Sequence, residues 1–210
     1  MTLWQLFLKG GPMMWPLLAC SIIAVAIFLE RIYALRQDNI IPSDLVQEME
    51  RLIRMARLDD LEELCKRSTS PICLVVMAAI KNVNMPRAII KDYMEEAGTR
   101  AAYTIERYID VLGTIATISP LLGLLGTVSG MIKSFNAIGI QGMHSQMLAS
   151  GISEALITTA AGLSIGIPVY IAYRFLIARS DYLLSEMEKT SARILEYLKG
   201  GGHEVQKAKG

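Results

Sequence analysis

The sequence predicts an all-α integral membrane protein with three transmembrane helices, two of them extended into a long cytoplasmic helical bundle. Three observations support this fold class: long uncharged runs, an uneven distribution of Lys and Arg, and helical periodicity in the charged parts. The 210 residues are 52% hydrophobic and 20% charged, whereas soluble domains are about 25% charged. The net charge of +1 gives no indication of nucleic acid or an acidic substrate.

Three uncharged runs are long enough to cross a bilayer. A hydrocarbon core about 30 Å thick needs roughly 20 apolar residues in a helix. The runs are residues 13–29, 111–132 and 155–173. A charged residue follows each of them directly. Trp4 and Trp15 flank the first run, which is typical of a membrane interface.

The first run has a second interpretation as a cleaved signal peptide. Residues 17–20, Leu-Leu-Ala-Cys, resemble a lipoprotein cleavage box. However, Lys9 is the only basic residue before the run, and the run continues nine residues past Cys20. We expect an intact first span, and the mass of the mature chain distinguishes the two interpretations.

Lys and Arg indicate the orientation, because cytoplasmic loops are enriched in both. Eleven lie in residues 36–107 and seven in residues 174–210, whereas residues 134–153 have none. The N-terminus and the 134–153 turn are therefore expected outside, and the C-terminus in the cytoplasm. The expected segments are an outer N-terminus (1–12), transmembrane helix one (13–35), a cytoplasmic helical region (36–110), transmembrane helix two (111–133), an outer turn (134–153), transmembrane helix three (154–174), and a cytoplasmic C-terminal helix with a flexible tail (175–210).

Helical periodicity continues in the cytoplasmic region. Ser43 is expected to cap a helix that ends near Ala56. Asp59 is expected to cap the next, with Glu62 completing a capping box. Pro71 suits the first turn of a third helix, which is almost entirely apolar and should be buried.

Two long helices are expected to continue from the membrane into the cytoplasm. The first runs from Pro86 to Phe135 with Pro120 as its one internal proline, and the second extends the third span to residues 200–202, three glycines. Their expected apolar stripes are Ile89, Tyr93, Ala97 and Ala101 in the first helix, and Leu183, Met187, Ile194 and Leu198 in the second.

Small residues recur in the last two spans at a spacing that lets helices pack closely in lipid. The pairs are Gly126 with Gly130 and Gly162 with Gly166. Pro120 and Pro168 each remove a backbone hydrogen bond, so we expect a kink at each.

Hydroxyl side chains form a polar stripe on each of these spans, and Glu154 adds a carboxylate at the membrane edge. The hydroxyls are Thr127, Ser129, Thr158, Thr159 and Ser164. Any one of them could bond a carbonyl of its own helix, and Glu154 could mark the interface or pair with a neighbouring chain. Ionisable groups in spans usually face a bundle interior or a wet cavity, so we expect a pore or a polar interface.

Enzymatic catalysis, a metal site and a cofactor have no support in the sequence. The chain has no glycine-rich phosphate loop and no nucleophile elbow. His144 and His203 lack a second ligand at helical spacing. Three cysteines without regular spacing predict free thiols.

The sequence motifs of the second and third spans resemble those of the ExbB/TolQ/MotA proton-channel family. Residues 123–132, Gly-Leu-Leu-Gly-Thr-Val-Ser-Gly-Met-Ile, resemble its second-span signature, and residues 154–163, Glu-Ala-Leu-Ile-Thr-Thr-Ala-Ala-Gly-Leu, its third-span signature. Span number, orientation and the large cytoplasmic segment also match, so the resemblance covers nearly the whole chain. MotA-type subunits have four spans, which favours the ExbB/TolQ branch. Ser129 departs from the tryptophan common there.

The resemblance implies a ring of five copies in the bacterial inner membrane, with the outer side as the periplasm. The ring would surround a single-span ExbD/TolR-type partner whose transmembrane Asp carries protons, and would energise a TonB- or TolA-type protein for nutrient import or envelope integrity. In that scheme Thr127 and Thr159 face the partner carboxylate. From the hydroxyl stripes we expect Ser129 and Thr158 to line the same pathway. We expect Glu154 to shape the polar entrance.

Two other functions remain open from the sequence. One is a non-conducting membrane scaffold that organises an envelope complex, against which the hydroxyl stripes argue. The other is a solute transporter or a standalone ion channel, which three spans without internal repeats disfavour.

Overall fold

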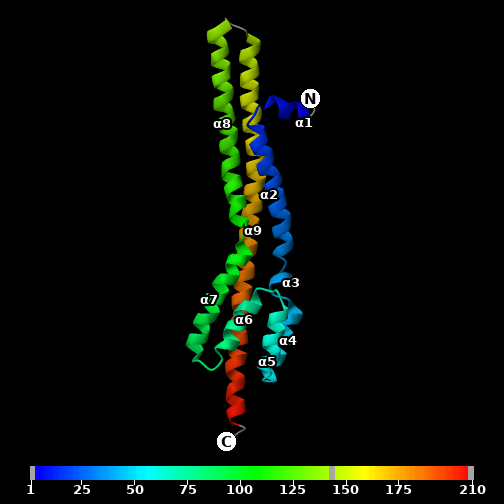
Figure 1. Ribbon diagram of the computed structural model, residues 1–210, viewed down its shortest axis with the longest axis vertical. Helices are drawn as coiled ribbons and strands as arrows, with labels where there is room; N and C mark the ends of the chain where they lie inside the picture. Colours follow the sequence, from blue (N-terminus) through cyan, green and yellow to red (C-terminus); the bar gives the residue numbers. More distant parts are fainter. Residues whose placement is uncertain (1–2, 142–144, 208–210) are drawn as a thin grey trace. The chain divides into compact units, whose positions relative to one another are not determined.

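The computed structural model describes residues 3–141 and 145–207, and most of these residues are helical (Figure 1). Within this part of the chain there is no strand, and three helices are long and apolar enough to cross a membrane, so the predicted fold class is confirmed. His144 lies outside the described residues, as does the side chain of His203. The helices are α1 (Leu3–Lys9), α2 (Met14–Ala34), α3 (Gln37–Ile40), α4 (Ser43–Arg54), α5 (Leu58–Arg67), α6 (Ile72–Lys81), α7 (Arg87–Glu106), α8 (Ile109–Gln141) and α9 (Ser145–Lys207).

The chain divides into two compact units, and α2 and α9 contribute residues to both. Unit 1 comprises Met1–Arg31 and Tyr108–Leu176, and unit 2 comprises Ile32–Arg107 and Ile177–Gly210. The apolar runs and both motifs fall in unit 1, which therefore holds the candidate site.

In unit 1, α8 and α9 lie side by side as a helical hairpin (Figure 1). The expected turn at residues 134–153 is mostly helical, because α8 continues to Gln141 and α9 begins at Ser145. A charged residue can end an apolar run without ending the helix. Residues 134–153 also contain no proline, which would interrupt a helix. Many large apolar side chains of the hairpin are exposed, among them Leu125, Leu156 and Ile171, as expected for a surface that contacts lipid or other subunits.

The single helix expected from Pro86 to Phe135 is interrupted, because α7 ends at Glu106 and α8 begins at Ile109. The cause is the backbone of Tyr108, whose φ of 69° lies in the left-handed region. No glycine or proline marks this position, so the break cannot be predicted from the local residues.

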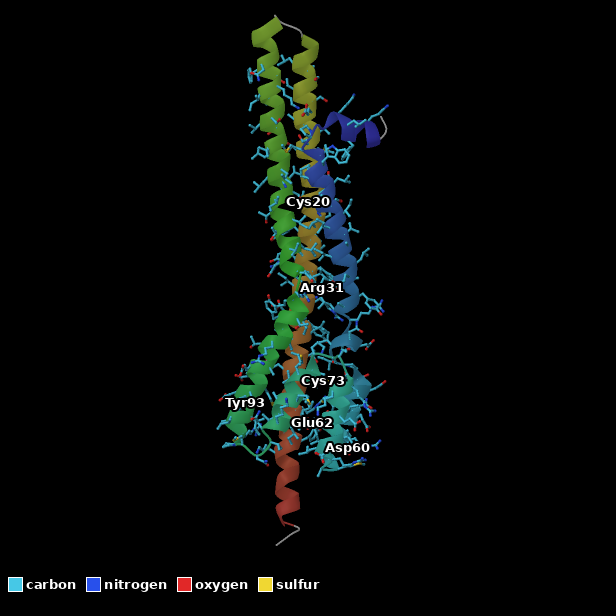
Figure 2. All side chains as sticks on the ribbon, in the orientation of Figure 1. Cys20, Arg31, Asp60, Glu62, Cys73 and Tyr93 are labelled. Atoms are coloured by element: carbon cyan, nitrogen blue, oxygen red, sulfur yellow. The ribbon has the colours of Figure 1, made fainter. Side chains whose placement is uncertain are left out.

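Arg31, labelled in Figure 2, is buried at 7% exposure, and its guanidinium lies 5.5 Å from the centroid of the Tyr108 ring. It also forms an ion pair with Glu30 at 2.5 Å. A cation over an aromatic face is attracted to the ring. This contact helps to hold Tyr108 in its strained conformation at the start of α8.

Unit 2 contains a helical core to which α6 and the C-terminal part of α9 both contribute buried apolar residues. The burial predicted for α6 is confirmed, and so is the predicted stripe on α9, whose four residues are all buried: Leu183, Met187, Ile194 and Leu198. Lys199 donates hydrogen bonds to the carbonyls of Val83 and Met85, at 3.0 and 2.7 Å, and so ties α9 to the segment after α6.

Two predicted helix caps are wrong. The N-cap positions of α4 and α5 are Pro42 and Arg57, and neither makes a side-chain cap bond. Ser43 is the first helical residue of α4, and Asp59 lies in the first turn of α5. Instead of completing a capping box, Glu62 pairs with Lys66 one turn later at 2.6 Å, and this hydrogen bond lowers the pKa of Glu62.

The stripe predicted on α7 is confirmed only in part. Ala101 is buried and Ala97 half-buried, but Ile89 and Tyr93 are exposed (Tyr93 is labelled in Figure 2). The other buried residues of α7 are Ile90, Met94 and Ile105. The observed face carries more large apolar side chains than the predicted one, which contained two alanines, so its burial removes more apolar surface from water.

The C-terminal helix does not end at the three glycines, because α9 continues to Lys207. Glycine lowers helix stability by about 1 kcal/mol but stops a helix only where it takes the left-handed conformation. The prediction of three free thiols is confirmed for Cys20, Cys65 and Cys73.

Candidate functional site

Glycines bring the backbones of α8 and α9 into direct contact. A Cβ added to Gly162 would lie 2.6 Å from the carbonyl oxygen of Ser119 and 3.0 Å from the Cα of Gly123. A Cβ on Gly130 would lie 2.6 Å from the carbonyl oxygen of Gly151, and one on Gly166 would lie 2.8 Å from the ring of Pro120. Helix association in lipid depends on such close packing. The predicted small-residue pairs thus lie in the seam between the two helices, and Pro120 and Pro168 lie within helices that continue past them.

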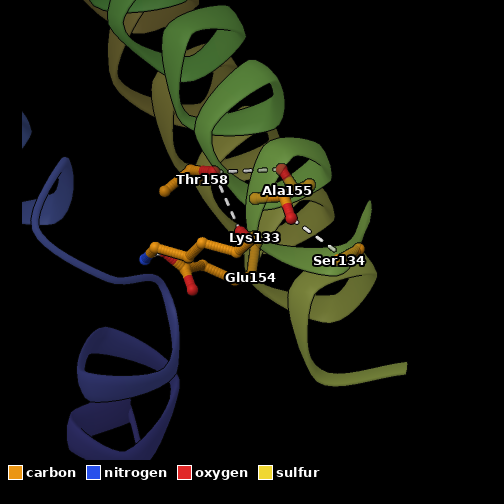
Figure 3. A network of polar contacts seen from close by, with 6 residues as sticks. Lys133, Ser134, Glu154, Ala155 and Thr158 are labelled. Atoms are coloured by element: carbon orange, nitrogen blue, oxygen red, sulfur yellow. Dashed lines mark hydrogen bonds and ion pairs between the residues drawn. The ribbon is translucent and has the colours of Figure 1, made fainter. Parts of the chain in front are cut away.

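Thr158 is placed inside this seam and not on a cavity wall. It is fully buried, and its Oγ1 donates to the carbonyl oxygens of Glu154 at 2.9 Å and Ala155 at 3.0 Å (Figure 3). Its side chain fills the space beside Gly126, where any Cβ would collide with it. Packing against α8 and the hydrogen bonds to the two carbonyls therefore engage the whole Thr158 side chain within this chain.

Thr159, the next residue, lies at the border of the seam. It is half-buried, and its Oγ1 donates to the carbonyl oxygen of Gly123 across the helix pair at 3.3 Å. Thr127 is also half-buried and donates to the carbonyl oxygen of Leu124 at 2.6 Å. Residues four apart share a helix face, so Thr127 lies on the same side of α8 as Gly123. The two threonine hydroxyls therefore belong to one edge of the hairpin, which we call the threonine edge.

Ser129 and Ser164 are not part of the threonine edge. Ser129 is half-buried and lies six residues after Gly123, which is about 240° around the helix at 100° per residue. Ser164 is exposed on α9. The structure thus does not bring the five expected hydroxyls together on one face.

Glu154 has a partner in its own chain. The Nζ of Lys133 on α8 donates to its Oε1 at 2.6 Å, and the Glu154 side chain is 17% exposed (Figure 3). The sequence showed both charges at the two ends of one turn, but only the continued helices bring them together. In the sequence alone, Lys133 marks only the boundary of a span.

Two buried serines and one glycine were also overlooked. Ser119 donates to the carbonyl oxygen of Ile115 at 2.7 Å, and Ser134 to that of Gly130 at 3.1 Å. A Cβ on Gly11 would collide with the carboxylate of Glu154. The Gly10-Gly11-Pro12 sequence was a signal for a tight turn, but it did not indicate what the turn contacts.

Cys65 and Cys73 in unit 2 form a buried thiol pair. The hydrogen bond that Cys65 donates to Cys73, together with burial, raises the pKa of Cys65. The same hydrogen bond lowers the pKa of Cys73 to about 7. Among the described residues no group of three or more His, Cys, Asp or Glu side chains could hold a metal ion.

Comparison with known proteins places this hairpin in a family. Residues 67–189 match the MotA/TolQ/ExbB proton channel family. The chain is 34% identical over 181 residues to an ExbB-like biopolymer transport protein of Synechocystis, covering 82% of this chain and 69% of that protein.

Two further relatives represent the ExbB and TolQ types. The chain is 27% identical to the biopolymer transport protein exbB1 of Vibrio cholerae, over 95% of this chain and 90% of that protein. It is 42% identical over 102 residues to the Tol-Pal system protein TolQ of Haemophilus influenzae, over 47% of this chain and 45% of that protein. Together with the three apolar helices, these matches show that the chain belongs to the MotA/TolQ/ExbB proton channel family and is a membrane subunit of the ExbB/TolQ type.

Proposed function

We propose that this chain is the ring-forming proton-channel subunit of an inner-membrane motor that couples the proton motive force to an outer-membrane-directed partner. The observation that carries the proposal is the threonine edge. Thr127 and Thr159 present two hydroxyls on one side of a hairpin whose other exposed side chains are mainly Leu, Ile and Val. Hydroxyls in such surroundings can orient water or bond a carboxylate.

The chain lacks an acid or base of its own at the level of these threonines. Between Asp110 and Arg174 only Lys133 and Glu154 carry a formal charge, and they pair at the end of the hairpin. A proton relay through the spans therefore needs a titratable group from another chain. A single-span ExbD/TolR-type partner with a transmembrane Asp has the required chemistry, and the type names of the relatives support this choice.

The proposed mechanism uses the charge of that Asp. When it is ionised, the threonine edge holds it by hydrogen bonds; when it is protonated, it is neutral and can pass the apolar side chains. One elementary charge that crosses 100 mV releases about 2.3 kcal/mol. This is several times the thermal energy, so few protons per step suffice to bias rotation.

The exposed apolar surface of the hairpin supports assembly of several copies around the partner. A ring brings one threonine edge from each copy to a shared axis, and five copies are the number that the family resemblance implies. The distribution of Lys and Arg supports a periplasmic N-terminus and a cytoplasmic C-terminus. A TonB- or TolA-type protein would receive the motion.

Replacing Thr159 by Val tests the proposal, and replacing Thr158 by Val is its matched control. Valine has nearly the shape of threonine without the hydroxyl, and the two positions are adjacent on α9. The complex of the chain with its single-span partner is reconstituted in proteoliposomes, and partner-dependent proton flux is measured. We expect Thr159→Val to abolish most of the flux and Thr158→Val to retain it, because the Thr158 side chain is fully buried in the seam, where its hydroxyl bonds two carbonyls of α9.

Equal flux in wild type and Thr159→Val would contradict the role of the threonine edge. If the wild-type complex itself conducts no protons, the chain is instead a non-conducting scaffold.

A further inference from the structure

Two thiols of unit 2, those of Cys65 and Cys73, lie in contact inside its helical core. Each residue is 4% exposed, and the Cys65 thiol donates a hydrogen bond to the Cys73 sulfur. Cys65 lies in the last turn of α5 and Cys73 in the first turn of α6. The third cysteine of the chain, Cys20, belongs to unit 1. The two sulfur atoms of unit 2 therefore need only a small approach to reach the disulfide bond length of about 2.0 Å.

The connection between α5 and α6, residues 68–71, is fixed by its serines. The Oγ of Ser68 accepts a hydrogen bond from the backbone N–H of Ser70 at 3.2 Å. Ser70 is itself buried, and its Oγ donates to the carbonyl oxygen of Ile40 at 2.5 Å. A disulfide between Cys65 and Cys73 thus joins two helices that already meet at a short, fixed connection. It can form without the movement of a distant element.

The surroundings of the pair favour ionisation of one thiol. Hydrogen bonds from Cys65 and Ser68 lower the pKa of Cys73 to about 7, although burial opposes this change. The start of α6 adds to the effect, because the positive end of a helix dipole favours a thiolate. The hydrogen bond to Cys73, burial and the carboxylate of Glu62 raise the pKa of Cys65. One thiol therefore ionises near neutral pH while its neighbour stays protonated.

This combination distinguishes the pair from cysteines that only fill a core. Cysteines buried in apolar surroundings have raised pKa values and are inert, whereas a thiolate is the species that oxidants attack. In the proposed orientation unit 2 lies in the cytoplasm, where thiols are kept reduced and disulfides are usually transient and redox-sensing. The free thiols of the structure then correspond to the resting state.

We propose that Cys65 and Cys73 are a redox-active dithiol, which a small hydroperoxide oxidises to a disulfide that joins α5 to α6 and stabilises unit 2. The Cys73 thiolate attacks one oxygen of hydrogen peroxide and the O–O bond breaks. The released hydroxide takes up a proton, and Cys73 becomes a sulfenic acid. Cys65 then attacks the Cys73 sulfur, so that the S–S bond forms, the S–O bond breaks, and the Cys65 proton leaves with the hydroxyl group as water. The two thiols lose two electrons, which reduce the peroxide to two molecules of water.

The burial of the pair determines the class of oxidant. At 4% exposure neither sulfur offers room for a bulky disulfide such as oxidised glutathione. Hydrogen peroxide is only slightly larger than water, so it can reach the Cys73 sulfur when the connection between α5 and α6 opens briefly. The site lies outside the hairpin, and none of its steps involves proton conduction.

Oxidation of the full-length chain, purified in detergent, tests the inference. The Cys20→Ser variant serves as the parent, because Cys65 and Cys73 are then the only thiols. The parent is treated with hydrogen peroxide or with oxidised glutathione, denatured and alkylated, and its intact mass is measured. We expect peroxide to remove the mass of two hydrogen atoms and to leave no thiol for alkylation. The midpoint of thermal unfolding should rise by about 5 °C. Dithiothreitol should reverse these changes, and oxidised glutathione should act at least about tenfold more slowly because access is restricted.

Two single-thiol variants of the parent assign the steps. In Cys65→Ala the sulfenic acid of Cys73 has no thiol to resolve it, so a 1,3-dione reagent should trap it. In Cys73→Ala the remaining thiol of Cys65 is buried without its partner and should react at least about tenfold more slowly.

Three results would overturn the inference: two free thiols after peroxide treatment, trapping at Cys65 in preference to Cys73, or a disulfide that leaves the thermal midpoint unchanged. Faster oxidation by oxidised glutathione than by hydrogen peroxide would overturn the choice of a hydroperoxide. Each of these results leaves the proposed function intact, because the threonine edge takes no part in the oxidation.

Discussion

Replacing Gly162 by Ala tests the backbone contact that brings α8 and α9 together. The new Cβ would lie 2.6 Å from the Ser119 carbonyl oxygen, whereas ordinary contacts begin at 3.4 Å, so the helices must separate locally by the difference of 0.8 Å. Both nearest neighbours are backbone atoms, and no rotamer change relieves the collision. Overpacking of this kind costs about 1–3 kcal/mol.

The same substitution also brings a gain, because Ala favours a helix over Gly by about 1 kcal/mol. The net change expected for Gly162→Ala is thus a loss of up to about 2 kcal/mol in the free energy of unfolding. Gly98→Ala measures the gain in helix propensity alone, because the new Cβ enters open space. This variant should raise the free energy of unfolding by about 1 kcal/mol.

Unfolding of the purified protein in mixed micelles, titrated with a denaturing detergent, measures both variants on one scale. Opposite shifts of the two midpoints are expected. If Gly162→Ala shifts the midpoint upward by as much as Gly98→Ala does, the backbones of α8 and α9 are not in contact at this point.

Three further predictions concern unit 2. Ala56 has a φ of 55°, so Ala56→Gly should raise the free energy of unfolding by about 0.5–1 kcal/mol, and a lower midpoint in chemical denaturation would contradict this. Lys199→Met removes two hydrogen bonds from an ammonium to carbonyls, at 2.7 and 3.0 Å, and should lower thermal stability by about 1–3 kcal/mol. Cys65→Ala removes the donor that lowers the pKa of Cys73, so alkylation of Cys73 should require higher pH than in wild type. An unchanged pH profile of alkylation, followed by mass spectrometry, would show that Cys65 does not act on Cys73.

The sequence predicted those features that depend on local composition. Apolar length determined the three spans, and the stripe on α9 followed from helical spacing. The small-residue spacing pointed to residues that lie in the seam. These features can be predicted from the sequence because each depends only on the composition and periodicity of a single helix.

Features that depend on how one helix packs against another could not be predicted from the sequence. Thr158 and Thr159 differ by about 100° around α9, and only the position of α8 decides which lies inside the seam. The break at Tyr108 has no glycine or proline signal, and it coincides with the contact of its ring with Arg31. The Lys133–Glu154 pair forms because both helices continue past the ends of their apolar runs.

The placement of charge in the hairpin leads to the need for a partner. In the seam, the glycines and Thr158 pack against each other and stabilise the hairpin. The Thr158 hydroxyl is already hydrogen-bonded within α9, so these residues offer no polar group to a ligand. The formal charges of Lys133 and Glu154 neutralise each other at one end. Along its apolar length the hairpin then offers hydroxyls but no titratable group, and hydroxyls cannot carry a proton across a membrane without such a group between them. The proposed function therefore requires another chain to place such a group against Thr127 and Thr159.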